Sequence, residues 1–320
     1  MSVAPLRWED AILLGGPTAV GKSAVACLLA ERVRGEIISA DAMQVFRGLD
    51  VGTAKPSSDD RHRVPHHLLD IVDLTEPFDA AAWVKAAETA LSGIKSRART
   101  AIICGGTGLY FKALLEGLGE APAPEPVLRL ELERTPLEQL LEELRRKDPL
   151  MYQQIDKENR RRVVRAVEVV RLSGRPYSTQ RSVWARRHGD AQSASAQLSV
   201  ARRLFGLERE REDLRKRIDQ RVEIMFRQGL VQETKRLMDQ GLAENRTAMQ
   251  AIGYRQVVEH LRGERSLDET VALIKQRTWQ FARRQRTWFR RQLDLEWVMI
   301  RPDESPESVV DRLLSLHSGR

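Results

Sequence analysis

The residues best suited to chemistry form a glycine-rich stretch near the N-terminus. Residues 16–23 read GPTAVGKS and match the pattern GxxxxGK(S/T) without a mismatch. Glycines let a backbone wrap around an anion, so that successive N–H groups point at its oxygens. Lys22 would contact phosphate oxygens as a mobile point charge, and Ser23 would bind a magnesium ion through its hydroxyl. We therefore predict a site for two or more linked phosphates, formed by Gly16, Pro17, Thr18, Ala19, Val20, Gly21, Lys22 and Ser23.

The residues on either side of this stretch predict the strand and the helix that such a loop requires. The apolar residues 11–14 indicate a buried strand, and residues 24–32 indicate a helix whose positive N-terminal end would face the phosphates. This context disfavours the alternative, a glycine-rich turn that matches by chance. Further strands are expected in 36–39 and 100–104, with a helix in 78–96 between them.

Strands that alternate with helices predict an α/β fold, here a P-loop NTPase-like parallel sheet flanked by helices. Ligands of such sheets bind at the carboxyl ends of the strands. Asp41 and Thr107 each follow a predicted strand, so we expect both of them beside the phosphate loop. Asp41 can bind a metal ion, act as a general base or cap a helix. Thr107 lies between glycines and can bind the far end of a diphosphate or, again, cap a helix.

The Pro- and Gly-rich stretch 117–126 predicts a domain boundary, because the pattern beyond it is mostly helical. We expect a catalytic core in residues 1–120, an all-helical insertion in 121–196 and a helical return in 197–320 that completes the core. The other predicted elements are a partial strand in 64–72, helices in 128–147, 159–173, 208–240, 250–261 and 267–293, and strands in 199–207 and 296–300.

The net charge of +8 is unevenly distributed along the chain. Residues 1–159 carry 19 Lys and Arg against 24 Asp and Glu, whereas residues 160–320 carry 34 against 21. Residues 275–293 hold seven basic residues and no acidic one, with Trp and Phe interleaved, a composition that can hold phosphates and stack bases. The basic half predicts a polyanionic partner such as nucleic acid; the alternative is a solvated helical surface with its aromatic residues in the core.

Two pairs of arginines are candidates to bind phosphates. Arg161 and Arg165 are four residues apart in a predicted helix and would share one face, which suits contacts to successive phosphates. Arg217 and Arg221 repeat this spacing and could close over a diphosphate or touch nucleic acid. Solvated charged faces and salt bridges to neighbouring acidic residues are the alternatives for both pairs.

Composition excludes several classes of protein. Charged residues make up 31% of the chain and the apolar runs are short, so no segment is expected to span a bilayer. Residues 1–10 lack the apolar core of a signal peptide, and Cys27 and Cys104 indicate small buried hydrophobes in a reduced compartment, so we expect a cytoplasmic protein. Cys27 and Cys104 also exclude an appended zinc finger, which needs four Cys and His ligands at close spacing.

Six segments resemble the tRNA dimethylallyltransferases, the enzymes that prenylate adenosine in tRNA, and they occur in the order of that family. They are GPTAVGKS (16–23), SADAMQVFRGLDVGTAKP (39–56), GGTGLYFKALLEG (105–117), RRVVRAVEV (161–169), AIGYRQ (251–256) and RRQRTWFRR (283–291). The resemblance therefore covers nearly the whole chain. It implies dimethylallyl diphosphate as donor, Mg²⁺ as cofactor and the adenosine immediately 3′ of the anticodon as acceptor, with a monomer that binds the anticodon stem-loop of tRNA.

The same resemblance implies roles for individual residues. Asp41 would act as general base on the N6 amine of the adenosine, Thr107 would orient the donor, and Arg129 would act near the reaction channel. The phosphate loop and a magnesium ion held by Ser23 would stabilise the diphosphate as it leaves, with Arg217 and Arg221 as further contacts. The residues implied to contact tRNA are Asp41, Ala42, Met43, Gln44, Arg161, Arg162, Val163, Val164, Arg165, Gln250, Ala251, Ile252, Gly253, Tyr254 and Arg255.

Two other functions fit parts of the sequence. A P-loop kinase acting on a nucleotide or another small molecule would explain about the first hundred residues, but it would leave the basic helical half unexplained. A non-catalytic RNA-binding module would explain that half. It would not explain why the residues suited to chemistry are intact, namely Lys22, Ser23, Asp41 and Thr107.

Overall fold

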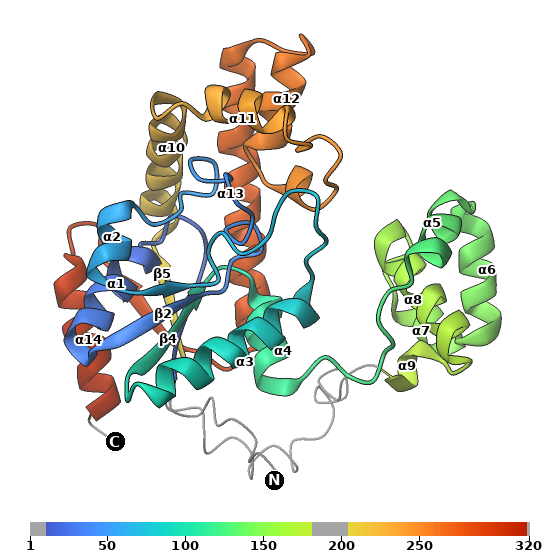
Figure 1. Ribbon diagram of the computed structural model, residues 1–320, viewed down its shortest axis with the longest axis horizontal. Coiled ribbons are helices and arrows are strands. Elements are labelled where there is room, and N and C mark those ends of the chain that lie inside the picture. The colour runs from blue at the N-terminus through green and yellow to red at the C-terminus, as the bar shows by residue number, and fades with distance from the viewer. Residues whose placement is uncertain (1–10, 181–203, 319–320) are drawn as a thin grey trace. The chain divides into compact units, whose positions relative to one another are not determined.

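The computed structural model describes residues 11–180 and 204–318 and divides the chain into two compact units (Figure 1). Unit 1 comprises Met1–Ala113 and Leu198–Arg320, and unit 2 comprises Leu114–Gln197. Unit 1 is therefore assembled from two separate parts of the chain. Within the described ranges, no helix is both long and apolar enough to cross a membrane.

Unit 1 is built around a six-stranded parallel sheet, which confirms the predicted fold class. Strands β1 and β2 are buried along their whole length, as expected for apolar strands covered on both faces. Residues 199–203 of one predicted strand lie outside the described residues. The strands, in the spatial order β3-β2-β4-β1-β5-β6, are β1 (Ile12–Gly15), β2 (Gly35–Ser39), β3 (His66–His67), β4 (Thr100–Gly105), β5 (Leu204–Arg209) and β6 (Glu296–Ile300).

Helices cover both faces of this sheet. On one face, Leu14 of β1 shares a core with Val25 and Val309, which belong to two different helices, α1 and α14. On the other face, the indole Nε1 of Trp83 in α3 donates to the carbonyl oxygen of Ser39 at 2.9 Å. The helices of unit 1 are α1 (Lys22–Val33), α2 (Ser58–Arg63), α3 (Ala80–Ser96), α4 (Gly108–Glu116, which runs into unit 2), α10 (Arg211–Arg227), α11 (Leu230–Met238), α12 (Tyr254–Leu261), α13 (Leu267–Gln292) and α14 (Pro306–Ser318).

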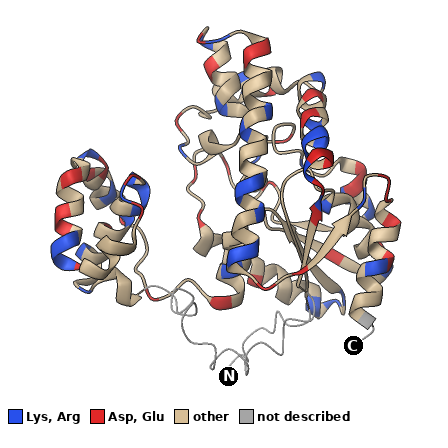
Figure 2. Ribbon diagram, turned by 180° about the vertical axis from the view of Figure 1, so that it is seen from behind, with Lys and Arg blue, Asp and Glu red and all other residues tan. Residues whose placement is uncertain are grey.

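The long helix α13 combines buried side chains with basic ones. Lys and Arg recur along it (Figure 2), while Ala282 and Phe289 are fully buried. Arg286 and Arg290 both bond to the carboxylate of Glu208 on β5. The helix therefore contributes one face to the core and presents basic residues on another.

Two predictions of continuous helix in unit 1 are wrong, in each case because of a glycine. Residues 208–240 are divided between β5, α10 and α11, and Gly229, with a φ of 94°, separates the two helices. In 250–261 the helix α12 begins only after Gly253, which has a φ of 110°. Such left-handed backbone is accessible to glycine and interrupts a helix. The partial strand expected in 64–72 is reduced to the two residues of β3.

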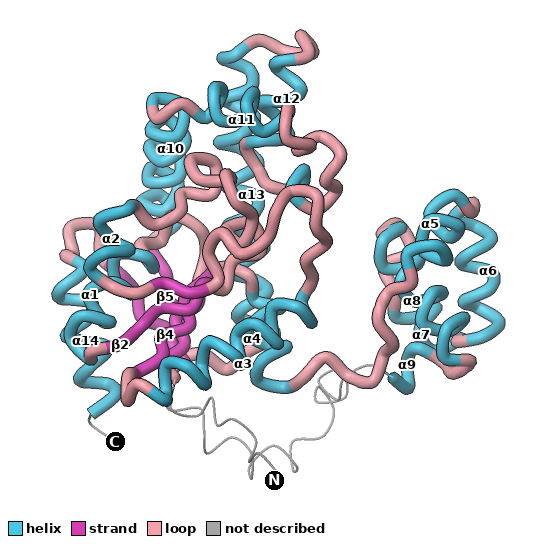
Figure 3. The backbone as a smooth tube through the Cα atoms, viewed as in Figure 1, coloured by secondary structure: helices cyan, strands magenta, loops and turns pink. Residues whose placement is uncertain are grey.

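The described residues of unit 2 are helical, whereas the strands lie in unit 1 (Figure 3). The helix predicted in 128–147 is divided at Pro136, which has no N–H to continue a helix. Gly174 ends α8 with a φ of 69°, as predicted. The helices are α5 (Pro126–Arg134), α6 (Leu137–Lys147), α7 (Pro149–Gln154), α8 (Arg160–Ser173) and α9 (Tyr177–Gln180). Their core contains Leu132, Leu140, Leu144, Met151, Val163, Val164, Ala166 and Val167.

Candidate active site

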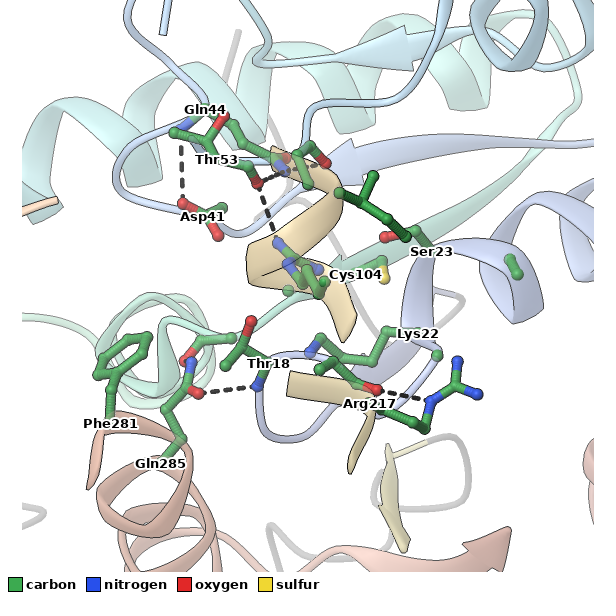
Figure 4. Close-up of a pocket in the computed structure, with 18 of the residues that line it drawn as sticks. Thr18, Lys22, Ser23, Asp41, Gln44, Thr53, Cys104, Arg217, Phe281 and Gln285 are labelled. Carbon is green, nitrogen blue, oxygen red and sulfur yellow. Dashed lines mark hydrogen bonds between the residues drawn. The ribbon is translucent and has the colours of Figure 1, made fainter. Parts of the chain in front are cut away.

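A cavity of about 330 Å³ lies in unit 1 at the carboxyl ends of β1, β2 and β4 (Figure 4). These three strands are neighbours in the sheet, so the segments that follow them meet at one edge, as predicted. Helices α10 and α13 complete the wall. The lining residues are Thr18, Ala19, Gly21, Lys22, Ser23, Ala24, Asp41, Gln44, Thr53, Ala54, Cys104, Gly105, Gly106, Arg217, Gln220, Arg221, Ile224, Phe281 and Gln285.

The glycine-rich loop has the conformation of an anion cradle. Gly21 has a φ of 109° and precedes α1, whose first turn has neither a side-chain cap nor an acidic residue. The N–H groups and the positive end of this helix are therefore directed at the cavity. Gly16 has a φ of 143°, and a Cβ there would lie 2.5 Å from the carbonyl oxygen of Leu207. Only glycine fits this position.

Five of the residues predicted to bind phosphates line the cavity, namely Thr18, Ala19, Gly21, Lys22 and Ser23. The other three, Gly16, Pro17 and Val20, set the course of the loop. The carbonyl oxygen of Pro17 accepts a hydrogen bond from Nζ of Lys22 at 2.6 Å. Val20 is fully buried in the core beneath the loop.

Three cations and one carboxylate line the cavity, namely Lys22, Arg217, Arg221 and Asp41. Burial lowers the pKa of Lys22 to about 8, and it also lowers the pKa values of Arg217 and Arg221. The positive charges are thus only partly compensated by the protein. An anion bound among them would favour their charged forms, so the cavity is electrostatically suited to a phosphate compound.

One carboxylate oxygen of Asp41 has the capping role that was one of those left open. Its Oδ1 accepts the N–H of Met43 at 2.9 Å and that of Gln44 at 3.4 Å, so the carboxylate does cap the turn after β2. Among the described residues, its Oδ2 has no hydrogen bond, and the partly exposed side chain lines the cavity. One oxygen therefore orients the carboxylate while the other can accept a proton. Ala42, Met43 and Gln44 are also partly exposed.

Thr107 does not line the cavity, although Gly105 and Gly106 just before it do. Its Oγ1 accepts the N–H of Ala42 at 3.1 Å, and its own N–H donates to the carbonyl oxygen of Ala40 at 3.1 Å. The residue therefore ties the turn after β4 to the segment that carries Asp41.

Gln285 of α13 connects the two glycine turns, and sequence reasoning assigned it no role. Its Oε1 accepts the N–H of Thr18 at 2.9 Å, and its Nε2 donates to the carbonyl oxygen of Gly106 at 2.9 Å. A signal for this role was present, because Gln285 stands at helical spacing between the buried Ala282 and Phe289. A polar side chain on the buried face of a helix almost always has a hydrogen-bond partner.

Two exposed apolar side chains in the wall were also missed. Ile224 of α10 is 43% exposed and Phe281 of α13 is 38% exposed, and both line the cavity. Phe281 lies beside Gln285 in Figure 4. They give a cavity that is otherwise rich in charge and polar backbone an apolar side, suited to a ligand that carries both phosphates and hydrocarbon.

Arg129 and Arg165 are held together in unit 2 by the buried Glu168. Nε of Arg129 donates to Oε1 of Glu168 at 3.1 Å, and Arg165 donates to Oε2 at 2.6 Å. Burial raises the pKa of Glu168, but the two guanidinium groups lower it by more, so the carboxylate is ionised. Arg165 also donates to the carbonyl oxygen of Pro122 at 2.6 Å. Its guanidinium thus has partners within unit 2, and the phosphate contact shared with Arg161 stays a prediction.

Of the other residues predicted to contact tRNA, some are exposed on the surface of their unit and others are buried. In α8, Arg161 and Arg162 are exposed, but Val163 and Val164 are buried in the core of unit 2, so these valine side chains are not available to RNA. In 250–255 of unit 1, Gln250 and Arg255 are exposed and Ile252 is partly exposed. The buried residues of that segment are Ala251, Gly253 and Tyr254.

Comparison with known proteins relates most of the chain to one group. The family model described as IPP transferase matches residues 44–292. The chain is 44% identical over 287 residues to tRNA dimethylallyltransferase 1 of Citrifermentans bemidjiense, which covers 90% of this chain and 91% of that protein. It is 44% identical over 291 residues to the tRNA dimethylallyltransferase of Geobacter metallireducens, with 90% and 91% covered. The solved tRNA isopentenylpyrophosphate transferase of Bacillus halodurans matches with a TM-score of 0.67 at 34% identity, covering 96% of this chain and 95% of that chain.

Proposed function

This chain belongs to the IPP transferase family, the family of the tRNA dimethylallyltransferases, and from that premise we propose that it transfers the dimethylallyl group of dimethylallyl diphosphate to N6 of the adenosine 3′ of the anticodon in tRNA. The observation that carries this proposal is that one cavity is lined by the phosphate loop, three cations and the carboxylate of Asp41. The cations suit a diphosphate leaving group, and the carboxylate suits the base that a primary amine requires.

The phosphate loop and its neighbouring cations would hold the diphosphate of the donor. Negative charge grows on the diphosphate as the bond between its oxygen and the prenyl carbon breaks. The N–H groups at the start of α1 and the charges of Lys22, Arg217 and Arg221 would stabilise it. Arg217 is already oriented, because its Nε donates to the carbonyl oxygen of Ala19 at 3.1 Å. Groups that are in place before the reaction need little reorganisation during it.

Asp41 would act on the acceptor. As the carbon–oxygen bond of the donor breaks, a new bond forms between N6 of the adenosine and the prenyl carbon, and Oδ2 of Asp41 accepts a proton from N6. The N–H groups of Met43 and Gln44 orient the carboxylate through Oδ1. Thr107 supports the same segment through Ala42, so we propose that it contributes by positioning Asp41.

We propose that the cavity also takes a magnesium ion. Ser23 and Asp41 line it together, and hydroxyl and carboxylate oxygens are ligands that Mg²⁺ accepts alongside water and phosphate oxygens. Among the described residues, no group of three or more His, Cys, Asp or Glu could hold a metal by itself. The ligands of the magnesium ion would therefore come from the hydroxyl of Ser23 together with oxygens of the substrate diphosphate. When bound, the ion would offset negative charge on the diphosphate.

We predict that the apolar side of the cavity receives the prenyl group. Changing Phe281 to alanine would enlarge this side, and we expect kcat/KM to shift by about tenfold from dimethylallyl toward geranyl diphosphate, since a pocket discriminates hydrocarbon length by contact. Steady-state kinetics with both donors would measure the shift. Leu267→Ala is the matched control, because Leu267 is an exposed apolar residue of the same helix outside the cavity. A donor preference unchanged in Phe281→Ala would place the prenyl group elsewhere.

We propose that unit 2, including Arg129, and the segment 250–255 contribute to tRNA binding by a cytoplasmic monomer. The exposed Arg161 and Arg162 give this proposal its test. Changing both to alanine should make the plot of log affinity for tRNA against log salt concentration less steep, by the equivalent of roughly one phosphate for each lost contact, because fewer counterions are released. Filter binding of the anticodon stem-loop over a range of salt concentrations measures the slope. An unchanged slope would show that both arginines belong to a solvated face and do not contact tRNA. The control is Arg32→Ala, which breaks a surface ion pair with Asp311 in unit 1.

One assay tests the proposed function against its alternatives. The protein is incubated with an unmodified anticodon stem-loop, labelled dimethylallyl diphosphate and magnesium. We expect label in the RNA. Transfer of phosphate from ATP to a small molecule would instead indicate a kinase, and tight stem-loop binding without product would indicate a non-catalytic RNA-binding protein.

A further inference from the structure

One wall of the cavity is formed by the loop of residues 51–54. The position of this loop determines the orientation of two side chains, those of Arg221 and Gln44. Thr53 and Ala54 line the cavity. The carbonyl oxygen of Thr53 accepts a hydrogen bond from Nη2 of Arg221 at 3.2 Å and another from Nε2 of Gln44 at 3.3 Å (Figure 4 shows Thr53 and Gln44). A displacement of this carbonyl would therefore move a cation of the diphosphate site.

The start of this loop is held by a carboxylate that lies outside the cavity wall. Glu233 of α11 is only 5% exposed. Its two carboxylate oxygens each accept the N–H of Val51 at 3.0 Å, and its Oε1 also accepts the N–H of Gly52 at 3.3 Å. Without this carboxylate, the N–H of Val51 would lose its acceptor and the N–H of Gly52 would lose one of its two, which is costly for partly buried donors.

Tyr254 of α12 completes the arrangement. Its hydroxyl donates to Oε1 of Glu233 at 2.6 Å and accepts the N–H of Gly52 at 3.1 Å. The side chain of Tyr254 is fully buried, and a Cβ at position 52 would lie 2.5 Å from its ring. Only a glycine at position 52 therefore lets the loop lie this close to the ring. Burial, followed by the charge of Glu233, raises the pKa of Tyr254, and the hydroxyl therefore remains a donor. Four hydrogen-bonding groups from α11, α12 and the loop thus form one connected set.

We propose that Glu233, with Tyr254, is a positioning residue for the diphosphate site: it holds the loop at Val51 and Gly52 so that the carbonyl of Thr53 keeps Arg221 directed at the cavity. The inference rests on the proposed function only in taking a diphosphate as the ligand of the cavity. Neither Glu233 nor Tyr254 lines the cavity, so in this proposal both act indirectly, through the loop and the Thr53 carbonyl that bonds to Arg221.

Truncation of Glu233 should weaken anion binding through Arg221. In Glu233→Ala we expect the Kd for inorganic diphosphate to rise about tenfold, because the N–H of Val51 loses its acceptor and the loop is free to shift. Glu233→Gln keeps one oxygen acceptor and should restore most of the affinity. Tyr254→Phe removes a single hydroxyl and should raise Kd by about threefold, and this variant preserves the test if Glu233→Ala fails to fold. Calorimetry with inorganic diphosphate measures all three values.

A double-mutant cycle separates positioning from general destabilisation. If Glu233 acts through Arg221, then Glu233→Ala should change Kd by less than about twofold in a protein that already carries Arg221→Ala. The matched control is Glu36→Ala. Glu36 is also 5% exposed and paired, with His67 and Arg97, but it lies in the first half of β2, away from the cavity.

Each outcome decides a different point. A wild-type protein that does not bind diphosphate would overturn both this inference and the proposed function. Tight wild-type binding with an unchanged Kd in Glu233→Ala and Tyr254→Phe would overturn the positioning role alone. Fully additive effects of Glu233→Ala and Arg221→Ala would do the same, since they would show that Glu233 acts by another route.

Discussion

Replacing Asp41 with asparagine is expected to lower kcat for prenyl transfer by about 100-fold or more, the usual loss when a general base is removed. The substitution is nearly isosteric. The side-chain oxygen of asparagine can still accept the N–H groups of Met43 and Gln44, so the turn after β2 should keep its geometry. What is lost is the ability to accept a proton from N6. Single-turnover kinetics with the anticodon stem-loop would measure the effect on the chemical step, and stem-loop affinity should change little.

Asp79→Asn provides a matched control for this experiment. Its Oδ1 accepts the N–H groups of Ala81 and Ala82 at 3.0 and 2.9 Å, the same local pattern as that of Asp41, but Asp79 caps α3 outside the cavity. We expect this variant to retain the wild-type kcat. If Asp41→Asn also retained it, Asp41 would be a cap only, and the base would have to be sought elsewhere.

Replacing Lys22 with methionine is expected to lower kcat/KM for dimethylallyl diphosphate by about 100- to 1000-fold, as for the loss of one donor that stabilises a developing anion. Methionine keeps much of the length of the side chain and removes its charge. Lys112→Met is the control, because Lys112 is also buried in unit 1 but bonds to Gln292 and does not line the cavity. Equal losses in the two variants would mean that any buried lysine is required for folding, and the assigned role of Lys22 would fail.

The pH dependence of donor binding gives a second test of Lys22. Burial lowers its pKa to about 8, so the unliganded protein loses the charge of Lys22 as the pH rises through that value. A diphosphate favours the charged form. Donor affinity should therefore be constant below about pH 8 and fall above it, and binding near pH 8 should take up protons. Calorimetry in buffers of different ionisation enthalpy measures this uptake, which should be absent in Lys22→Met.

The phosphate loop and the parallel sheet were predictable because their signals are local. The GPTAVGKS pattern, the apolar strand before it and the helix after it lie within residues 11–33. Asp41 could be placed near this loop because parallel strands align their carboxyl ends, and β1, β4 and β2 are indeed neighbours. The helix breaks at Gly229 and Gly253 were missed because apolar periodicity continues through them, whereas the positive φ that ends a helix is invisible to that pattern.

The contacts that were missed join residues far apart in the chain. Gln285 meets Thr18 across 267 positions, and Glu233 meets Val51 across 182. No local pattern pairs such residues; only the packed fold does. Arg165 is a different case, because its bond to Glu168 joins residues three apart on α8 and is the salt bridge that the sequence analysis left open as an alternative. Spacing along a helix indicates which side chains share a face, and it does not indicate which partners are already present there.

The central claim is that one cavity releases diphosphate while Asp41 takes the proton of an adenosine amine. The most direct measurement is mass spectrometry of nucleosides from an anticodon stem-loop after incubation with the protein, magnesium and dimethylallyl diphosphate, with released diphosphate measured in parallel. We predict one dimethylallyl group on N6 of the adenosine 3′ of the anticodon for each diphosphate released, and no product when that adenosine is replaced by purine riboside, which lacks the amine. Diphosphate release without a modified adenosine, or a prenyl group on any other atom, would contradict the claim.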